Sequence, residues 1–182
     1  MNYIIVTGGL GYIGSNTIIQ LLKKGYTPII FDNLSNSSIH VLDTIYDITK
    51  KNVIFNNIDI SSKDIFTSMK SYKKYNIVGI IHFAALKSVS QSIQNPLLYY
   101  KNNINGLLNM LEIMNLYHIP NFIFSSSATV YSSINTLPFK EDQIIGQNLT
   151  CPYGKTKYFC EEILQDFYKK YKHKNILLLR YF

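Results

Sequence analysis

The stretch VTGGLGYIGS, residues 6–15, decides the fold of this chain. It leads from the apolar segment Tyr3–Thr7, which has the composition of a buried strand, into Tyr12–Lys24, whose apolar residues gather on one side of a helix. Its glycines fit both G-x-G-x-x-G and G-x-x-G-x-x-G, spacings that allow a tight turn, a close approach of the backbone to a pyrophosphate, and packing of the helix against the strand. A strand, a glycine loop and a helix in this order predict a dinucleotide-binding unit.

Two acidic residues follow later apolar segments and bear on the choice of cofactor. Asp32 comes directly after Pro28–Phe31, the second predicted strand. A carboxylate at this place accepts hydrogen bonds from a ribose 2′-OH and repels a 2′-phosphate, so we predict NAD rather than NADP. Asp59 ends the third predicted strand region, which begins at Val53, and two interpretations stay open for it: an adenine-side contact or a helix N-cap.

Strand-like and helix-like segments alternate along all 182 residues. This alternation predicts an α/β fold, a doubly wound parallel sheet of the Rossmann type with helices on both faces, and one cofactor-binding domain over residues 1–182. The strands are continuous apolar runs, as burial on both faces requires. The further predicted helices lie near residues 38–49, 62–72, 96–117 and 153–171, and the further predicted strands at 77–83, 122–125 and 176–181.

The amino-acid composition argues against several classes of partner. The formal net charge is +7, yet all but one of the 18 basic residues are lysine, whereas phosphate-binding surfaces usually bring arginine. We therefore predict no nucleic-acid partner. The longest nearly uncharged apolar run, Ile77–Leu86, is about half of what a membrane span needs, and no secretory signal is seen. Cys151 and Cys160 form neither a C-x-x-C pair nor a metal array, which favours a reducing cytoplasm and no metal site.

A tyrosine and a lysine one helical turn apart, Tyr153 and Lys157, form the candidate catalytic pair. The spacing alone carries no weight, because it occurs at two other places in this chain. Only this pair lies near the start of its helix and after a predicted strand that ends in three serines, Ser125–Ser127. A nearby ammonium favours the phenolate of a tyrosine, and a serine hydroxyl can hold a reacting oxygen and relay its proton. We therefore predict Ser127, Tyr153 and Lys157 as catalytic residues.

Taken together, these segments resemble the extended short-chain dehydrogenases, and in particular the UDP-glucose (UDP-galactose) 4-epimerases. The resemblance covers the whole chain in order, which makes it more specific than any single motif. It is carried by the glycine loop and by the segments IHFAALK (81–87), YYKNN (99–103), FIFSSSATVY (122–131), PYGK (152–155) and LRYF (179–182).

The resemblance implies an isomerase of galactose metabolism that interconverts UDP-galactose and UDP-glucose by transient oxidation at sugar C4, with NAD as the resident cofactor. Tyr153 would take the proton of the 4-OH. The UDP-hexose contacts implied in this way are Lys87, Ser127, Tyr153 and Phe182. The implied cofactor-binding residues are Gly8, Gly11, Tyr12, Ile13, Gly14, Asp32, Asn33, Asp59, Ile60, Phe83, Ala84, Lys87, Asn102, Ser125, Tyr153, Lys157 and Tyr181.

The resemblance also carries expectations about assembly and extent. The predicted helices 96–117 and 153–171 hold more apolar residues than one face can hide, and the resembling enzymes dimerise through the equivalent helices, so we expect a homodimer. Those enzymes continue past the position of Phe182 by a stretch on the order of 100 residues that supplies most substrate contacts. We expect that substrate domain to be missing here, apolar surface to be exposed near Phe182, NAD to bind weakly at best, and epimerisation by these 182 residues alone to be absent.

Two departures and three alternatives remain at the level of sequence. Ala85 and Ser132 stand where the resembling enzymes usually have glycine, and neither change removes a chemical group. A nucleotide-sugar 4,6-dehydratase needs further acid and base groups, which in that family follow the catalytic serine or threonine as Asp-Glu, whereas Ala128 and Thr129 follow Ser127 here. A related 5-epimerising or decarboxylating enzyme is a further alternative, and a non-catalytic NAD-binding module is the alternative from a different class.

Overall fold

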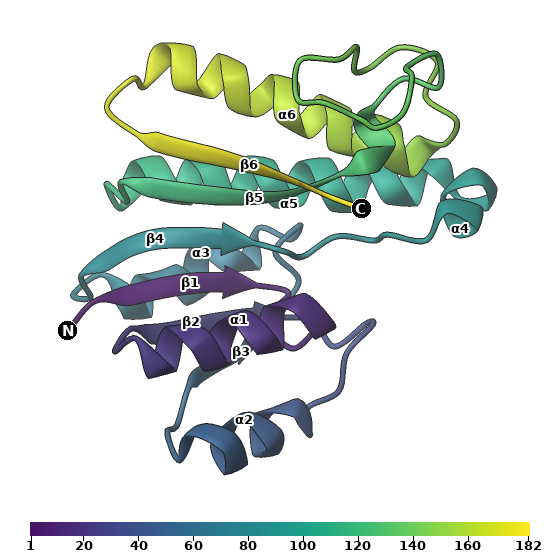
Figure 1. Cartoon of the computed structure of the whole chain (residues 1–182). Coiled ribbons are helices and arrows are strands. Elements are labelled where there is room, and N and C mark those ends of the chain that lie inside the picture. Colours follow the sequence, from purple (N-terminus) through teal and green to yellow (C-terminus); the bar gives the residue numbers. More distant parts are fainter.

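Six parallel strands form one sheet in the order β3–β2–β1–β4–β5–β6 (Figure 1). The structure is a computed structural model that describes residues 1–182. The chain begins in the middle of the sheet, runs outward to β3, and returns to place β4 beside β1, so the direction of winding reverses between these two strands. The strands are β1 (Tyr3–Thr7), β2 (Thr27–Asp32), β3 (Ile54–Asn57), β4 (Ile77–His82), β5 (Asn121–Ser127) and β6 (Asn175–Tyr181).

Helices cover both faces of this sheet, as the alternating pattern predicts. Figure 1 shows α1 and α2 beside the purple and blue strands, and α5 and α6 beside the green and yellow strands. The helices are α1 (Tyr12–Lys23), α2 (Val41–Thr49), α3 (Asp64–Met69), α4 (Val89–Gln94), α5 (Pro96–Leu116) and α6 (Pro152–Lys170), with 3₁₀ turns η1 (Lys70–Tyr72) and η2 (Ala128–Val130). Most predicted elements lie within a few residues of their observed bounds.

The hydrophobic core has two parts, one on each face of the sheet. Successive residues of a strand point to opposite faces, so Ile5 and Ile29 enter the larger part while Val6 and Ile30 enter the smaller one. The larger part lies under α3, α5 and α6, and the smaller one lies under α1 and α2. These apolar layers fix the strands from which the loops of the site emerge.

One helix is not predicted from the sequence, and one prediction about a strand is wrong. The sequence gives no sign of α4, because it is a short polar helix without apolar periodicity; it begins where the Ser88 hydroxyl accepts a hydrogen bond from the Gln91 amide at 3.3 Å. The strand β6 is not buried on both faces. Ile176 and Leu178 pack against the larger core, but Leu177 is 52% exposed because no element covers its side of the strand.

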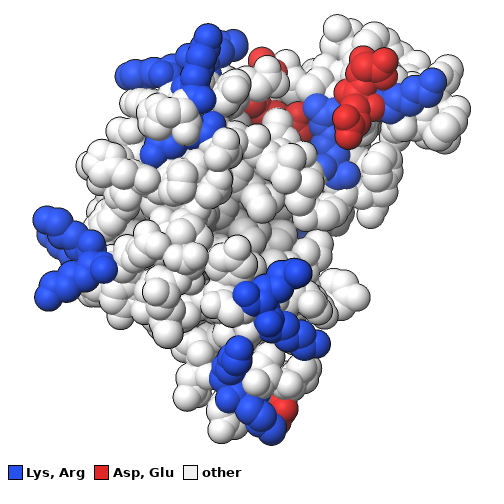
Figure 2. Space-filling view, turned by 60° about the vertical axis from the view of Figure 1, so that its left-hand side comes forward, with Lys and Arg blue, Asp and Glu red and all other residues white.

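The lysines of the surface lie in separate groups. On the face shown in Figure 2, blue side chains stand in small groups set apart by uncharged surface. The lysine pairs of the sequence, such as Lys23 with Lys24 and Lys73 with Lys74, are all exposed. In this structure no helix combines the length and the apolar composition that crossing a membrane requires.

Candidate functional site

The glycine loop is shaped by contacts that leave no room for side chains. Gly8 has φ +65°, a conformation that favours glycine, and a Cβ there would lie 2.7 Å from the backbone nitrogen of Ala84. A Cβ on Gly14 would overlap the carbonyl oxygen of Gly8. Gly11 is the N-cap of α1 and offers no side chain to the first turn, so backbone N–H groups of that turn remain available to an anion.

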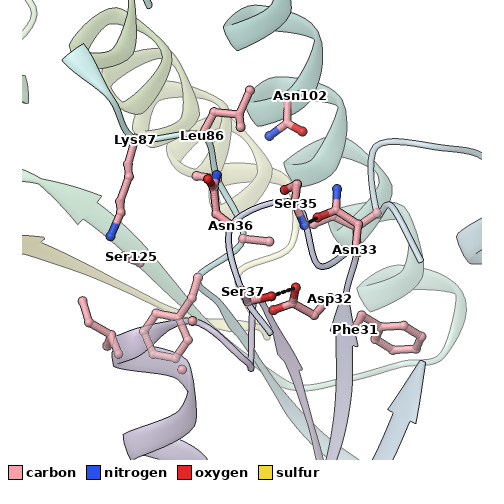
Figure 3. Close-up of a pocket in the computed structure, with 18 of the residues that line it drawn as sticks. Phe31, Asp32, Asn33, Ser35, Asn36, Ser37, Leu86, Lys87, Asn102 and Ser125 are labelled. Carbon is pink, nitrogen blue, oxygen red and sulfur yellow. Dashed lines mark hydrogen bonds between the residues drawn. The ribbon is translucent and has the colours of Figure 1, made fainter. Parts of the chain in front are cut away.

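A cleft of about 340 Å³ runs along the carboxyl ends of the strands. The structure places every predicted cofactor-binding residue on its wall, together with the three predicted catalytic residues. Segments that are distant in sequence therefore meet here: the glycine loop, the ends of β2, β4 and β5, and the first turns of α6. Figure 3 shows Lys87 and Ser125 at one side of this cleft and Asp32 with Asn33 at the other.

Asp32 ends β2 and is nearly buried, with 7% exposure. Its carboxylate accepts hydrogen bonds from the backbone amides of Leu10 and Leu34, both at 3.0 Å, and from the Ser37 hydroxyl at 2.7 Å (Figure 3). One side chain thus joins the glycine loop to the loop after β2. An ionised carboxylate has about four lone-pair sites, so with three hydrogen bonds accepted it keeps capacity for a ligand hydroxyl.

The hydrogen bonds of Asp59 decide between its two interpretations. Its carboxylate accepts hydrogen bonds from the amide and the hydroxyl of Ser61, at 2.8 and 2.7 Å, in a local turn. The N-cap of α3 is Lys63, so the helix-cap interpretation is wrong. Asp59 lies two residues beyond the end of β3 and lines the cleft, next to Ile58 and Ile60.

The three candidate catalytic side chains come from β5 and α6. Ser127 is the last residue of β5, and its hydroxyl oxygen accepts hydrogen bonds from the amide and the hydroxyl of Thr129, at 3.2 and 3.0 Å. The Ser127 hydroxyl proton is not used in these two bonds and can be donated to another group. Tyr153 is half-buried in the first turn of α6, and Lys157 follows one turn later with 3% exposure. The Lys157 ammonium donates to the Ser125 carbonyl at 2.6 Å and lies 4.8 Å from the ring centroid of Phe124.

Burial controls the titration of this pair. It lowers the pKa of Lys157 from 10.5 to about 8, although Cys160 and Glu161 act in the opposite direction. It also raises the pKa of Tyr153, while the interaction with the Ser127 hydroxyl lowers it. The sequence predicts that the lysine favours the phenolate, yet in this structure burial has the largest effect on the pKa of Tyr153, and the Ser127 hydroxyl is the group that lowers it. A ligand that brings positive charge to the cleft would shift this balance.

The buried histidine at the end of β4 belongs to the scaffold of the cleft. His82 accepts or donates one hydrogen bond, between its Nδ1 and the Thr7 hydroxyl at 3.0 Å, and its ring is stacked on Phe124. Burial, followed by the charge of Lys157, lowers its pKa from 6.5 to about 3. His82 is therefore neutral at physiological pH and ties β1 to β4 beneath the glycine loop.

One predicted substrate residue lies outside the cleft. Phe182 is 88% exposed and stacks on Phe139 and Tyr131, with ring centroids 6.1 and 6.3 Å apart. Its assignment to the sugar stays a prediction. Ala85 lines the cleft, whereas Ser132 is fully buried and its amide donates to the Ile144 carbonyl at 3.0 Å.

Eight further residues line the cleft that are not among the predicted site residues. The polar run after Asp32 could have been found from its place at the carboxyl end of β2, where ligands of open α/β sheets bind. The apolar lining residues cannot be distinguished in the sequence from other residues of the hydrophobic core. The additional lining residues are Phe31, Ser35, Asn36, Ser37, Ile58, Ala85, Leu86 and Ser126.

Comparison with known proteins agrees with this arrangement. The family model described as GDP-mannose 4,6 dehydratase matches residues 5–182. The UDP-glucose 4-epimerase of Dictyostelium discoideum is 45% identical over 179 residues, which are 98% of this chain and 51% of that protein. The human UDP-glucose 4-epimerase is 42% identical over 185 residues, 98% of this chain and 52% of that protein.

Among solved structures, UDP-glucose 4-epimerases are also similar to this chain. The crystal structure of UDP-glucose 4-epimerase from Bifidobacterium longum in complex with NAD⁺ and UDP superposes with a TM-score of 0.93 at 40% identity, covering 99% of this chain and 53% of that one. The chain thus spans about half the length of the proteins that it matches. It belongs to the family described as GDP-mannose 4,6 dehydratase, and it is similar to UDP-glucose 4-epimerases over about half of their length.

Proposed function

We propose that residues 1–182 are the NAD-binding domain of an enzyme that interconverts UDP-galactose and UDP-glucose. One observation carries the proposal: a single cleft brings the glycine loop and Asp32 together with Ser127, Tyr153 and Lys157. The similarity to UDP-glucose 4-epimerases supports it, and one of the similar structures contains NAD⁺ and UDP.

The glycine loop and the end of β2 fit a dinucleotide. The space that a Cβ would fill at Gly8 and Gly14 is already taken by backbone, so only a loop of this composition can form the turn at the N-terminus of α1. The amides of that first turn would hold the pyrophosphate. Asp32, whose carboxylate keeps lone-pair capacity beside Ser37, would hold the adenosine ribose and exclude a 2′-phosphate.

Each of the three candidate catalytic residues has a separate role in proton transfer at the sugar 4-OH. Tyr153 would take the proton of the sugar 4-OH and later return it, with the Ser127 hydroxyl holding the same oxygen. Burial raises the pKa of Tyr153. Lys157, fixed by the Ser125 carbonyl, would place its positive charge beside the phenol, where a positive charge opposes this effect. When bound, NAD⁺ supplies the hydride acceptor for sugar C4 and a further positive charge.

The dehydratase alternative lacks its acid and base groups in this structure. Ala128 and Thr129 form the 3₁₀ turn directly after Ser127, and the Thr129 hydroxyl is bound to Ser127. No carboxylate therefore stands directly after Ser127 to remove the C5 proton or to protonate the C6 hydroxyl as it leaves. The family description includes dehydratases, but these residues support epimerisation.

The test is made in a fusion, because the chain covers about half of its relatives. Residues 1–182 are joined to the remaining half of the Dictyostelium discoideum UDP-glucose 4-epimerase, and conversion of UDP-galactose is measured. We expect turnover, a loss of about 10²-fold or more in kcat on Tyr153→Phe, and unchanged NAD content. Tyr158→Phe on the same helix is the control and should keep full activity. A fusion that folds and binds NAD without converting UDP-galactose would refute the proposed function.

We also infer a homodimer and a cytoplasmic location. Part of the apolar surface of α5 and α6 remains exposed, including Leu97, Leu108 and Phe159, with exposures of 70%, 40% and 42%. These helices lie side by side and together offer one apolar surface to a second copy. Cys151 and Cys160 are both free thiols, which supports a reducing compartment.

A further inference from the structure

An ion pair between a fully buried glutamate and a partly buried arginine lies next to the candidate catalytic residues. Glu161 of α6 has 0% exposure, and both of its carboxylate oxygens are bound by Arg180 of β6. The distances are 3.1 Å from Nε to Oε1 and 2.8 Å from Nη2 to Oε2, the two-pronged geometry in which arginine binds carboxylates most strongly. The Ser126 hydroxyl donates a further hydrogen bond to Glu161.

The other side of Arg180 holds the loop between β5 and α6. Its Nη1 donates to the Tyr131 hydroxyl at 3.2 Å and to the Glu141 carbonyl at 3.4 Å, and the guanidinium lies 5.0 Å from the Tyr131 ring centroid. The hydrogen bonds to Glu161 raise the pKa of Arg180, so it stays charged at all relevant pH values. The loop that it holds separates Ser127 from Tyr153 in the sequence.

Three consecutive residues of β5 make three different connections to this region. The Ser125 carbonyl accepts a hydrogen bond from the Lys157 ammonium. The Ser126 hydroxyl donates one to Glu161, and Ser127 lines the cleft. Lys157 and Glu161 are four residues apart on α6 and therefore neighbours on one helix face. The end of β5 is thus attached to α6 at two successive turns of the helix.

The charges of this region are interdependent. Lys157 has 3% exposure, and burial disfavours its ammonium form, while Cys160 and Glu161 favour it. Glu161 is the only carboxylate among the groups that act on the pKa of Lys157. The other titratable or charged groups around Lys157, Tyr153 and Glu161 are His82 of β4, Tyr99 of α5, Cys151 at the start of α6, and Arg180 of β6.

We propose that Glu161, held by Arg180, is a positioning residue for Lys157: it fixes α6 against the end of β5 and places a negative charge one helical turn from the lysine ammonium. The inference rests on the proposed function, in which Lys157 must be both charged and beside Tyr153. Glu161 itself does not line the cleft. Its effect on the reaction therefore passes through Lys157 and the adjoining serines.

The first test measures Lys157 in the 182-residue chain without substrate. Lysine labelled with ¹³C at Cε is titrated by NMR, and the Lys157 signal is assigned by its loss in Lys157→Met. We expect a midpoint near pH 8 in the unchanged chain. In Glu161→Gln the midpoint should move to lower pH, because the favourable charge is gone and the positive charge of Arg180 is no longer balanced. Glu162→Gln, the same change at the next and exposed residue, should leave the midpoint in place.

A second variant guards against unfolding. Glu161→Gln leaves the partly buried charge of Arg180 without its partner and is expected to destabilise the fold, so it is compared with the double variant Glu161→Gln/Arg180→Gln, in which neither charge remains. Arg180→Lys keeps the positive charge but not the two-pronged contact. We expect the midpoint to fall in the double variant and to stay near its original value in Arg180→Lys. An unchanged Lys157 midpoint in a folded double variant would overturn the electrostatic part of the inference.

The second test follows the reaction in the fusion with the epimerase half. The active form needs Lys157 protonated, so Glu161→Gln should move the alkaline limb of the kcat–pH profile to lower pH and lower kcat at pH 8, with NAD affinity within about twofold of the original. Glu162→Gln should change neither. A uniform loss of activity with an unmoved alkaline limb would show a merely structural role and refute the inference. Failure of the proposed function looks different, because the unchanged fusion would then be inactive while the NMR titration still reports on Glu161.

Discussion

The carboxylate of Asp32 joins the glycine loop to the loop after β2 and leaves part of its hydrogen-bonding capacity free. We predict that the chain binds NAD at least about tenfold more tightly than NADP, since a buried carboxylate opposes a 2′-phosphate. Asp32→Asn should reduce this preference, because the charge is removed while one oxygen remains for the Leu10 amide. Calorimetric titration with both cofactors measures the ratio. Asp43→Asn, at an exposed position of α2, is the control; tighter binding of NADP by the unchanged chain would contradict the role of Asp32.

The pKa of His82 predicts in which direction the free energy of unfolding changes with pH. Its pKa is about 3 in the folded chain, against 6.5 for a solvated histidine, so the unfolded chain binds more protons between these values. The free energy of unfolding should therefore be highest above pH 6.5 and fall, by on the order of a few kcal/mol, as the pH drops toward 3. Urea unfolding at pH 7.5 and pH 5 measures the change.

The matched variants separate His82 from other titrating groups. His82→Asn keeps an amide near the position of Nδ1 and does not titrate, so its free energy of unfolding should change less between pH 7.5 and pH 5 than that of the unchanged chain. His40→Asn, at an exposed histidine, should keep the original dependence. An equal pH dependence in His82→Asn and the unchanged chain would contradict the assignment.

At the scale of the element, β6 presents two different faces. Leu178 packs against the larger core, while Leu177 is 52% exposed. Leu178→Thr should lower the free energy of unfolding by about 1–3 kcal/mol, because buried apolar surface is lost and a hydroxyl is introduced. Leu177→Thr should change it by less than about 0.5 kcal/mol and should reduce binding of a hydrophobic dye. Equal destabilisation by the two changes would show that Leu177 is covered in solution.

At the scale of the whole molecule, α5 and α6 determine the assembly that we infer. Several apolar residues of these helices that the sequence offers for a dimer are core residues in the structure, among them Leu107, Met110, Leu111, Met114 and Leu164. Leu108 and Phe159 remain exposed. We predict a dimer at micromolar concentration by light scattering, and a monomer after Leu108→Arg together with Phe159→Arg. Ile48→Arg, at an exposed residue of α2, is the control; a monomeric unchanged chain would contradict the inference.

The sequence by itself determined the sheet, the order of its elements and the glycine loop. Apolar runs and glycine spacing are local properties, and the alternation of strands and helices limits the topology to few arrangements. Asp32, Tyr153 and Lys157 could be named because each has a fixed place relative to a strand end or a helix start. The short helix α4 could not, because its residues carry no apolar period.

Only the tertiary structure decided which groups control the candidate site. The protonation of Lys157 depends on burial and on Glu161, and the contact of Glu161 with Arg180 joins residues 19 positions apart in different elements. The same holds for His82 and Thr7, which are 75 positions apart and meet because β1 and β4 are neighbours in the sheet. Desolvation and hydrogen bonding depend on what packs around a group, and the packing partners come from segments that the local pattern does not connect.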